Sequence, residues 1–177
     1  MERHPDQTAS LLRGEVLIDL VWLPDSVIGA KGVVFINAAP DVVWHMLTDY
    51  DHLQETMPKV TASCLVEENG HGKIIEQTGK SGIFIFEKSV RFTLKVDEQY
   101  PKHLHFEQIG GDFRVYEGDW FLDAVEGKEG SGTLLTYEAK IKPAFFAPPF
   151  LVSFVQSQDL PTILKGIRKF CESQIQG

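Results

Sequence analysis

The chain has 177 residues, of which 43% are apolar and 24% charged, and its formal net charge is −8. This length suits a single domain with a sizeable core, and the composition is that of an ordinary globular protein. The acidic balance, without any run of Lys or Arg, argues against charge-driven partners. We therefore expect neither nucleic acid nor a strongly acidic membrane held by charge alone.

Cysteine usage and the apolar segments favour a soluble protein of the reducing cytoplasm. Cys64 and Cys171 form no CxxC motif, so neither a zinc ribbon nor a thioredoxin-like site can be built from them. The polar N-terminus lacks the apolar centre of a secretory signal. The most apolar stretch runs only from Ala144 to Val155, whereas a membrane-spanning helix needs about 20 residues.

The beginning of the chain is predicted to be a tail followed by a strand region. We expect residues 1–12 to form a flexible tail or a short helix, and residues 13–177 to form one domain. Alternating apolar residues from Gly14 to Ile36 predict strand. The interruption at Pro24-Asp25-Ser26 makes this region one broken strand or a hairpin.

Two short helices are predicted next. Pro40 and Asp41 open the first, because Pro suits a first helical turn and a carboxylate complements the positive helix end. Thr48 or Asp49 would cap the second, and Pro58 would end it.

After Pro58 the apolar period changes to two, which predicts an antiparallel meander joined by short turns such as Asn69-Gly70. The expected strands are Val60–Glu67, Lys73–Thr78, Ile83–Asp97, His103–Ile109, Phe113–Val125 and Thr133–Ile141.

The end of the chain returns to helical spacing, with Pro161 expected to kink or split the helix near Asp159. A long meander must curl, and the helix is the element long enough to cover one face. The predicted fold class is α+β, with a curved antiparallel sheet of about six to seven strands wrapped around a long C-terminal helix. The apolar side of that helix is expected to carry Phe150, Phe154, Ile163, Leu164, Ile167, Phe170 and Cys171.

A helix across a concave sheet tends to leave an apolar space that can hold a ligand. A stripe of rings is also typical of an ordinary core, so the pocket is inferred from the architecture and not from any one ring. The ligand-binding candidates share the expected inner surface: Phe84, Phe86, Lys88, Phe92, Phe106, Tyr116, Trp120, Tyr137, Phe146, Phe150 and Phe154.

Lys88 is the charged member of this set. It falls on the same strand face as Phe86 and Val90, where an unpaired ammonium would be costly. Either it meets a carboxylate such as Glu76 or a polar ligand group, or a bulge turns it outward.

The segment from Ile36 to Trp44, running through Leu47-Thr48-Asp49-Tyr50-Asp51-His52-Leu53 to Met57-Pro58, resembles the opening signature of the START-like (SRPBCC, helix-grip) superfamily. This superfamily includes coenzyme Q-binding proteins, polyketide cyclase/dehydrase-like proteins and the birch-pollen-allergen group. The resemblance covers about residues 30 to 173. The segments closest to the coenzyme Q-binding branch are Gly111-Asp112-Phe113, Glu117 to Phe121 and Thr133 to Tyr137.

The resemblance implies a helix-grip, START-like ligand-binding domain with a deep apolar cavity. Its members bind lipids, quinones, sterols or polyketides, mostly without catalytic machinery. It also implies that Asp49-Tyr50 forms the turn between the short helices, as a cap plus a packed ring, while Gly14 to Ile28 is an added strand region. The aromatic positions that match the family pattern are Trp44, Phe113, Trp120 and Tyr137.

No catalytic motif is present: the sequence has no GxSxG elbow, P-loop, HExxH or GxGxxG. His103 and His105 share a strand face with Glu107, which we interpret as the solvated side of the strand, since no third metal ligand lies at useful spacing. We therefore expect no catalytic residue, no metal and no cofactor.

Three functions stay open. The first is a carrier or chaperone for a lipid, quinone or isoprenoid-like molecule, as a monomer or weak dimer. In that case Pro143 to Phe150 would border the cavity mouth, and Phe145 and Phe146 could touch a bilayer transiently, although the segment could equally be a buried linker.

The second is a polyketide cyclase or dehydratase, which would need only a polar pair in the cavity, such as Lys88 with Glu76 or Tyr116 with Arg114. The third is an interaction module whose cavity is filled by its own side chains.

Overall fold

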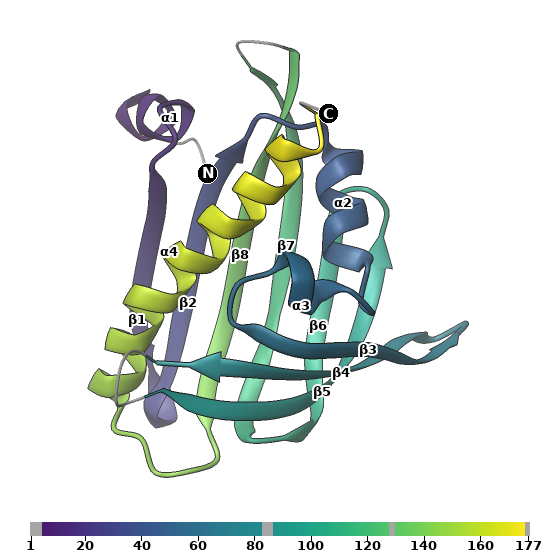
Figure 1. Ribbon diagram of the computed structural model, residues 1–177. Helices are drawn as coiled ribbons and strands as arrows, with labels where there is room; N and C mark the ends of the chain where they lie inside the picture. Colours follow the sequence, from purple (N-terminus) through teal and green to yellow (C-terminus); the bar gives the residue numbers. More distant parts are fainter. Residues whose placement is uncertain (1–4, 83–86, 128–129, 176–177) are drawn as a thin grey trace.

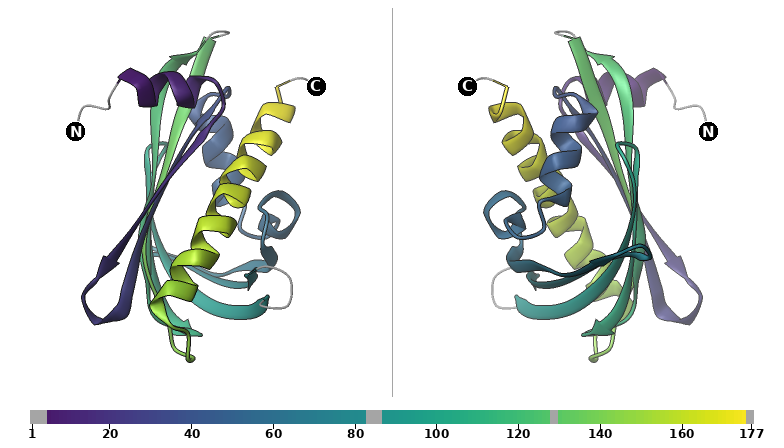
Figure 2. Two further views of the ribbon diagram at one scale, coloured as in Figure 1. Left: turned by 90° about the vertical axis from the view of Figure 1, so that its left-hand side faces the viewer. Right: turned by 90° about the vertical axis from the view of Figure 1, so that its right-hand side faces the viewer.

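One helix, α4, crosses the concave side of a curved antiparallel sheet (Figures 1 and 2). The computed structural model describes residues 5–82, 87–127 and 130–175. In chain order the elements are α1 (Pro5–Leu12), β1 (Val16–Leu23), the 3-10 turn η1 (Pro24–Ser26), β2 (Val27–Ile36), α2 (Pro40–Thr48), α3 (Leu53–Thr56), β3 (Val60–Asn69), β4 (Gly72–Ser81), β5 (Lys88–Gln99), β6 (His103–Gly111), β7 (Phe113–Gly127), β8 (Gly130–Pro143) and α4 (Pro149–Ser173).

The sheet has eight strands in the order β1-β2-β8-β7-β6-β5-β4-β3, and each neighbouring pair is antiparallel. This exceeds the expected six to seven because the N-terminal region forms a true hairpin, with Val16 opposite Val34 and Leu23 opposite Val27. β2 then pairs with β8, so the added hairpin extends one edge of the sheet.

A bulge between β5 and β6 turns the sheet sharply. Gly110 pairs with Thr93 while Gln108 pairs with Leu94, which leaves Ile109 as the extra residue. Gly111 beside it has a φ of 133°, and a Cβ there would collide with the backbone of Arg91. Only glycine fits this position. Beyond the bulge, β5, β4 and β3 run across the direction of the other strands (Figure 1).

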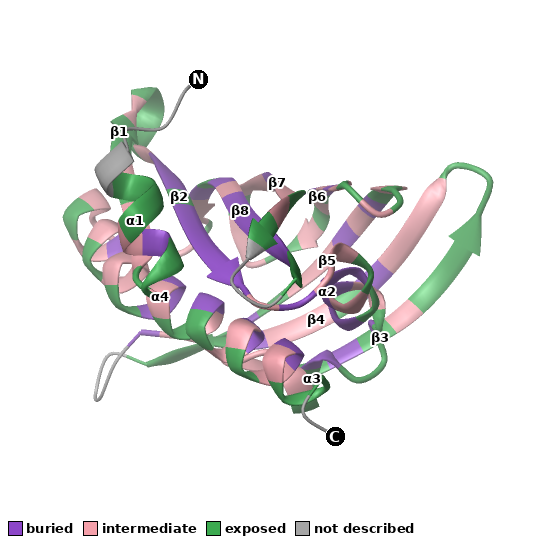
Figure 3. Ribbon diagram, turned by 90° about the horizontal axis from the view of Figure 1, so that it is seen from above, coloured by how far each residue is buried: buried purple, intermediate pink, exposed green. Residues whose placement is uncertain are grey.

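Helix α4 is continuous from Pro149 to Ser173, so Pro161 does not split it. A Cβ on Gly32 of β2 would approach Leu164 to 2.6 Å, and a Cβ on Gly166 would collide with the ring of Pro58. Gly32 therefore lets α4 lie close to the sheet, and Gly166 lets it lie close to Pro58, which precedes β3. Figure 3 shows buried residues along β2, β8 and the sheet-facing side of α4.

The two short helices form as expected, with one difference. α2 begins at Pro40, and Tyr50 after it is a buried, packed ring. The residue at the N-cap of α3 is His52, not Thr48 or Asp49, and no side chain caps that helix. Asp49 instead hydrogen-bonds the imidazole of His52 at 2.8 Å. The predicted cap role of Asp49 was wrong because α3 starts later and is only one turn long.

Most of the N-terminal segment expected to be a tail forms helix α1. Leu11 is buried in a small second core with Val33, Phe35 and Leu134, on the sheet face away from α4. Of the two readings offered by the sequence, the structure has the short helix. Within the described part of the chain, no helix combines the length and apolarity needed to cross a bilayer.

A candidate ligand cavity between the sheet and the C-terminal helix

Three adjoining chambers lie between α4 and the inner face of the sheet. The middle chamber has a volume of about 130 Å³, and it shares Ser81, Val90, Phe113, Ile141 and Gln156 with a mouth chamber of about 230 Å³. An inner chamber of about 70 Å³ lies toward α2 and α3, and it shares four residues with the middle chamber: Met57, Gln77, Tyr116 and Trp120. The space therefore narrows from the mouth inward.

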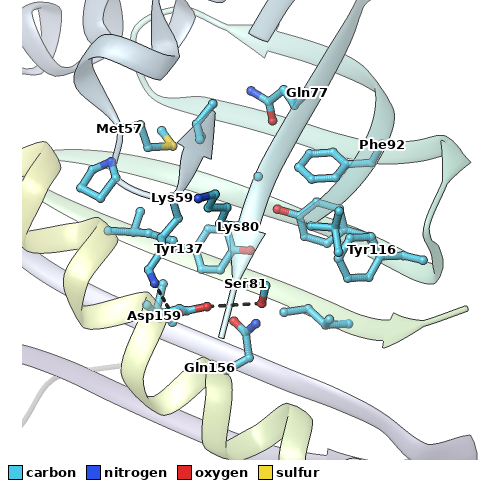
Figure 4. Close-up of a pocket in the computed structure, with 18 of the residues that line it drawn as sticks. Met57, Lys59, Gln77, Lys80, Ser81, Phe92, Tyr116, Tyr137, Gln156 and Asp159 are labelled. Atoms are coloured by element: carbon cyan, nitrogen blue, oxygen red, sulfur yellow. Dashed lines mark hydrogen bonds and ion pairs between the residues drawn. The ribbon is translucent and has the colours of Figure 1, made fainter. Parts of the chain in front are cut away.

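One wall consists of aromatic rings contributed by β5, β6, β7 and β8, of which Phe92, Tyr116 and Tyr137 are labelled in Figure 4. Tyr116 is its centre, with ring centroids 5.2 Å from both Phe92 and Phe106. Trp120 lies 4.6 Å from Tyr137. Tilted and edge-on contacts of this kind are typical of packed aromatic pairs. Five of the predicted candidates are thereby brought together: Phe92, Phe106, Tyr116, Trp120 and Tyr137.

Two phenol groups of this wall, those of Tyr116 and Tyr137, are largely removed from solvent and influence each other's pKa. Burial raises the pKa of Tyr116, against the smaller lowering effect of its interaction with Tyr137. Burial also raises the pKa of Tyr137 well above its ordinary value, and the neighbouring Tyr116 adds to the shift. Both phenols therefore stay protonated near neutral pH, and they can donate hydrogen bonds but are poor bases.

A polar cluster stands at the α4 side of the middle chamber (Figure 4). Asp159 of α4 is buried, and its Oδ2 accepts hydrogen bonds from the Gly82 amide at 2.9 Å and from the Ser81 hydroxyl at 3.3 Å. Its Oδ1 lies 3.2 Å from Nζ of Lys59. That contact is an ion pair without hydrogen-bond geometry. Lys59 also donates to the Gly82 carbonyl at 3.0 Å.

The sequence interpretation missed this cluster. The available signal was an acidic residue, Asp159, within the apolar period of the long helix, between Val152 and Ile163. Such a residue needs a buried partner. Nothing in the local sequence indicates Lys59 as that partner, because the two meet only when α4 docks.

Lys88 lies at the rim of the cavity. It lines the mouth chamber together with Val90, so strand alternation holds and no bulge turns it away. Its side chain is exposed, and Nζ lies 3.6 Å from the ring centroid of Phe145. The proposed partner Glu76 was wrong: it pairs with Thr93 on the opposite face of the sheet, whereas Lys88 pairs with Ser81.

Two other predicted positions differ in the structure. Phe150 and Phe154 are 65% and 51% exposed, not inward-facing. Residues such as Leu151, Val152 and Val155 face the chamber instead, because the helix docks through that side. Phe146 lines the mouth chamber but is 94% exposed, at its outer rim. Phe84 and Phe86 lie outside the described residues.

Arg114 also differs from expectation, since it is exposed and does not share the cavity with Tyr116. A register shift between Phe113 and Val115 breaks the alternation of β7 between the two residues.

The two strand histidines lie on the sheet face away from α4, as expected for a solvated side. His103 Nε2 and His105 Nδ1 lie 2.7 Å and 2.9 Å from the same oxygen of Asp119 on β7. Partial burial raises the pKa of Asp119, but the two histidine hydrogen bonds outweigh this effect and lower it overall. Within the described residues, no group of three His, Cys, Asp or Glu is arranged to hold a metal ion.

Comparisons with solved structures show the same fold. The Zhui aromatase/cyclase from Streptomyces sp. R1128 matches with a TM-score of 0.70 at 12% identity, over 84% of this chain and 96% of that one. A START superfamily protein from Mycobacterium smegmatis matches with a TM-score of 0.66 at 13% identity, over 84% and 97%.

A STAR-related lipid transfer protein from Xanthomonas axonopodis matches with a TM-score of 0.59 at 16% identity, over 90% of this chain and 99% of that one. No curated protein matches this chain. The model of the family described as "Polyketide cyclase / dehydrase and lipid transport" matches residues 36–168, from the end of β2 into the last turns of α4. The chain belongs to this family.

Proposed function

We propose that this protein is a non-catalytic carrier or chaperone that holds a hydrophobic small molecule, of the lipid, quinone or isoprenoid class, in the cavity under α4. The observation that carries the proposal is the row of three mostly apolar chambers, walled in part by rings, of about 230, 130 and 70 Å³. Ligand sites are typically apolar concavities with a few placed polar groups, and this one offers two phenol donors.

The volume of the chambers argues against a module whose cavity is filled by its own side chains. Such a module would leave no space beyond about one water's share, roughly 30 Å³. The mouth and middle chambers, at about 230 and 130 Å³, both exceed that limit.

The exposed rings at the cavity rim are suited to ligand exchange at a membrane surface. Phe145 and Phe146 border the mouth chamber, and Phe146 is almost fully exposed. An exposed ring beside the opening can enter the interfacial region of a bilayer while the ligand passes. We propose this transient contact, made by a monomer or weak dimer, as the exchange step.

A cyclase or dehydratase is the second candidate, favoured by the likeness to an aromatase/cyclase and by the Tyr116–Tyr137 hydroxyl pair. Both phenols have raised pKa values, and the carboxylate of the same chamber, Asp159, is already engaged by Lys59 and the Gly82 amide, which favours binding over proton abstraction. Turnover of a polyketide-like substrate that disappears in Tyr116→Phe or Lys88→Met would instead support the enzyme.

The resemblance to coenzyme Q-binding proteins makes a quinone one candidate cargo. Mass spectrometry of an organic extract of the purified protein tests the carrier directly. We expect a stoichiometric lipid, quinone or isoprenoid that is lost in the Phe92→Ala/Trp120→Ala variant. Phe121→Ala is the matched control, since that ring stacks on His103 on the other sheet face.

Circular dichroism would verify that all three proteins are folded. An empty extract, together with no binding of added lipids or quinones, would overturn the carrier function.

A further inference from the structure

Lys88 lies at the mouth of a mostly apolar chamber and has no anionic partner among the described residues. Among the described residues that line the mouth chamber, it is the one charged side chain. No carboxylate of the described residues lies within ion-pair distance of its Nζ, and its contact is the Phe145 ring, 3.6 Å away. The ring orients the ammonium but leaves its hydrogen-bond donors available.

The polar cluster around Asp159, deeper in the cavity, differs from this rim because its charges are already paired. The carboxylate of Asp159 is already engaged by Lys59, by Ser81 and by the Gly82 amide. An anionic ligand group placed there would have to compete for cations that are already paired, because Lys59 is held by Asp159 and Lys80 by Glu87. The charge distribution therefore favours a negative group at the rim and an uncharged body inside.

The shape of the space restricts that body. An apolar cavity of about 150 Å³ holds one benzene molecule. The middle chamber, at about 130 Å³, is slightly smaller than this, and the inner chamber, at about 70 Å³, is smaller still. A fused ring system could pass inward only by displacing the aromatic wall. A single flexible chain could pass without displacing it.

We propose that the ligand is a single-chain amphiphile with an anionic head, a carboxylate or a phosphate. The head is bound by Lys88 at the mouth, and the chain runs inward past Phe113 and Tyr116 toward α2 and α3. This inference rests on the proposed binding function and narrows it: within the lipid, quinone and isoprenoid classes, it selects fatty acids and alkyl or isoprenyl phosphates over neutral quinones.

The test is calorimetric titration of the delipidated full chain with laurate, lauryl phosphate, lauryl alcohol and a neutral alkyl benzoquinone. Laurate and lauryl phosphate distinguish a carboxylate head from a phosphate head. Lauryl alcohol has the same chain without the charge. The variants are Lys88→Met, which keeps the apolar stem, Lys88→Arg, which keeps the charge, and Lys95→Met as control. Lys95 lies on the same strand but on the opposite face, 3.8 Å from Asp97.

We expect one or both anionic probes to bind more tightly than the alcohol and the quinone. Lys88→Met should weaken the anionic probes by about fivefold, as is typical of a partly solvated ion pair, and leave the alcohol unchanged. Lys88→Arg and Lys95→Met should behave like the parent chain. High salt should remove most of the difference between acid and alcohol.

Equal affinity for acid and alcohol, or an equal loss of both in Lys88→Met, would overturn the anionic-head inference while leaving the binding function intact. Binding of none of the four probes would overturn both.

Discussion

Nζ of Lys59 lies 3.2 Å from Oδ1 of Asp159, an ion pair that joins the start of β3 to the middle of α4. The Asp159 side chain is 6% exposed and that of Lys59 is 24% exposed, so the carboxylate is the more desolvated partner. Because Asp159 also holds the Gly82 amide, the end of β4 is fastened to the helix that covers the cavity. This cluster fixes one wall of the middle chamber.

Removing one partner of this pair should destabilise the fold strongly. Lys59→Met leaves the buried Asp159 carboxylate uncompensated and should lower the free energy of unfolding by about 3 kcal/mol. Urea denaturation at neutral pH measures it, with the exposed Lys165→Met on the same helix as control. A loss no larger than that of the control would show that the pair contributes nothing.

A large side chain at the junction of two chambers should block the cavity. Val90 is buried and lines both the mouth and middle chambers, so Val90→Trp should fill the passage and abolish binding of long-chain ligands. The overpacking should lower the free energy of unfolding by about 1–3 kcal/mol. Val66→Trp is the matched control, since Val66 is 54% exposed on β3. Unchanged affinity in the folded Val90→Trp protein would contradict the path through these chambers.

The exposed rings at the rim should matter for exchange rather than for binding. Phe146 at the outer rim and Phe150 in the first turn of α4 are 94% and 65% exposed, so replacing both by Ser should leave the fold intact and change the ligand affinity little. Transfer of ligand between liposomes should slow by about tenfold or more, because each ring loses interfacial burial worth at least about 1 kcal/mol. Ile109→Ser, at another exposed apolar position on β6, is the control. Equal transfer rates would exclude the contact.

Acid should weaken the Asp119 cluster in a defined direction. Its pKa in the folded chain is below the ordinary value of 3.8 because two histidines hydrogen-bond the carboxylate. A lowered folded-state pKa adds stability that is fully present above pH 3.8 and is lost as the pH falls through the folded value. The stability difference between the parent chain and Asp119→Asn should therefore shrink below pH 4, in urea titrations at a series of pH values. A constant difference would argue against the linkage.

A methyl group at Gly166 should push α4 away from the loop before β3. The added Cβ of Gly166→Ala would collide with the ring of Pro58, a rigid neighbour that cannot rotate aside. We expect a net loss of about 1–2 kcal/mol in thermal or urea unfolding, despite the better helix propensity of Ala. Pro58→Ala should relieve the collision in the double variant. A stabilised Gly166→Ala protein would show that the helix is free to shift.

Local patterns in the sequence predicted most of the fold. Asn69-Gly70 marked the turn between β3 and β4 to within one residue, since the turn itself is Gly70-His71, and Pro40 marked the start of α2. Strict alternation placed Val90, Phe92 and Leu94 on one face of β5, and the structure has them facing inward. These features follow from backbone conformation and a period of two, which a short segment encodes by itself.

The departures arise where distant parts of the chain meet. The bulge between Phe113 and Val115 turned Arg114 outward, and helix docking left Phe150 and Phe154 exposed. An apolar period identifies the stripe of a helix only approximately. The rotation that is finally adopted depends on which neighbours allow close approach, here Gly32 and Pro58.

The sequence by itself determined the order of the elements, the curled sheet with its covering helix, and the ring-rich inner face, because each follows from local periodicity and turn chemistry. Only the tertiary structure decided which rings form the cavity wall, that Lys59 is the partner of Asp159, and that Lys88 at the mouth meets the ring of Phe145 and no carboxylate of the described residues. Such pairings depend on strand register and helix rotation, which are set by the packing of segments far apart in the chain.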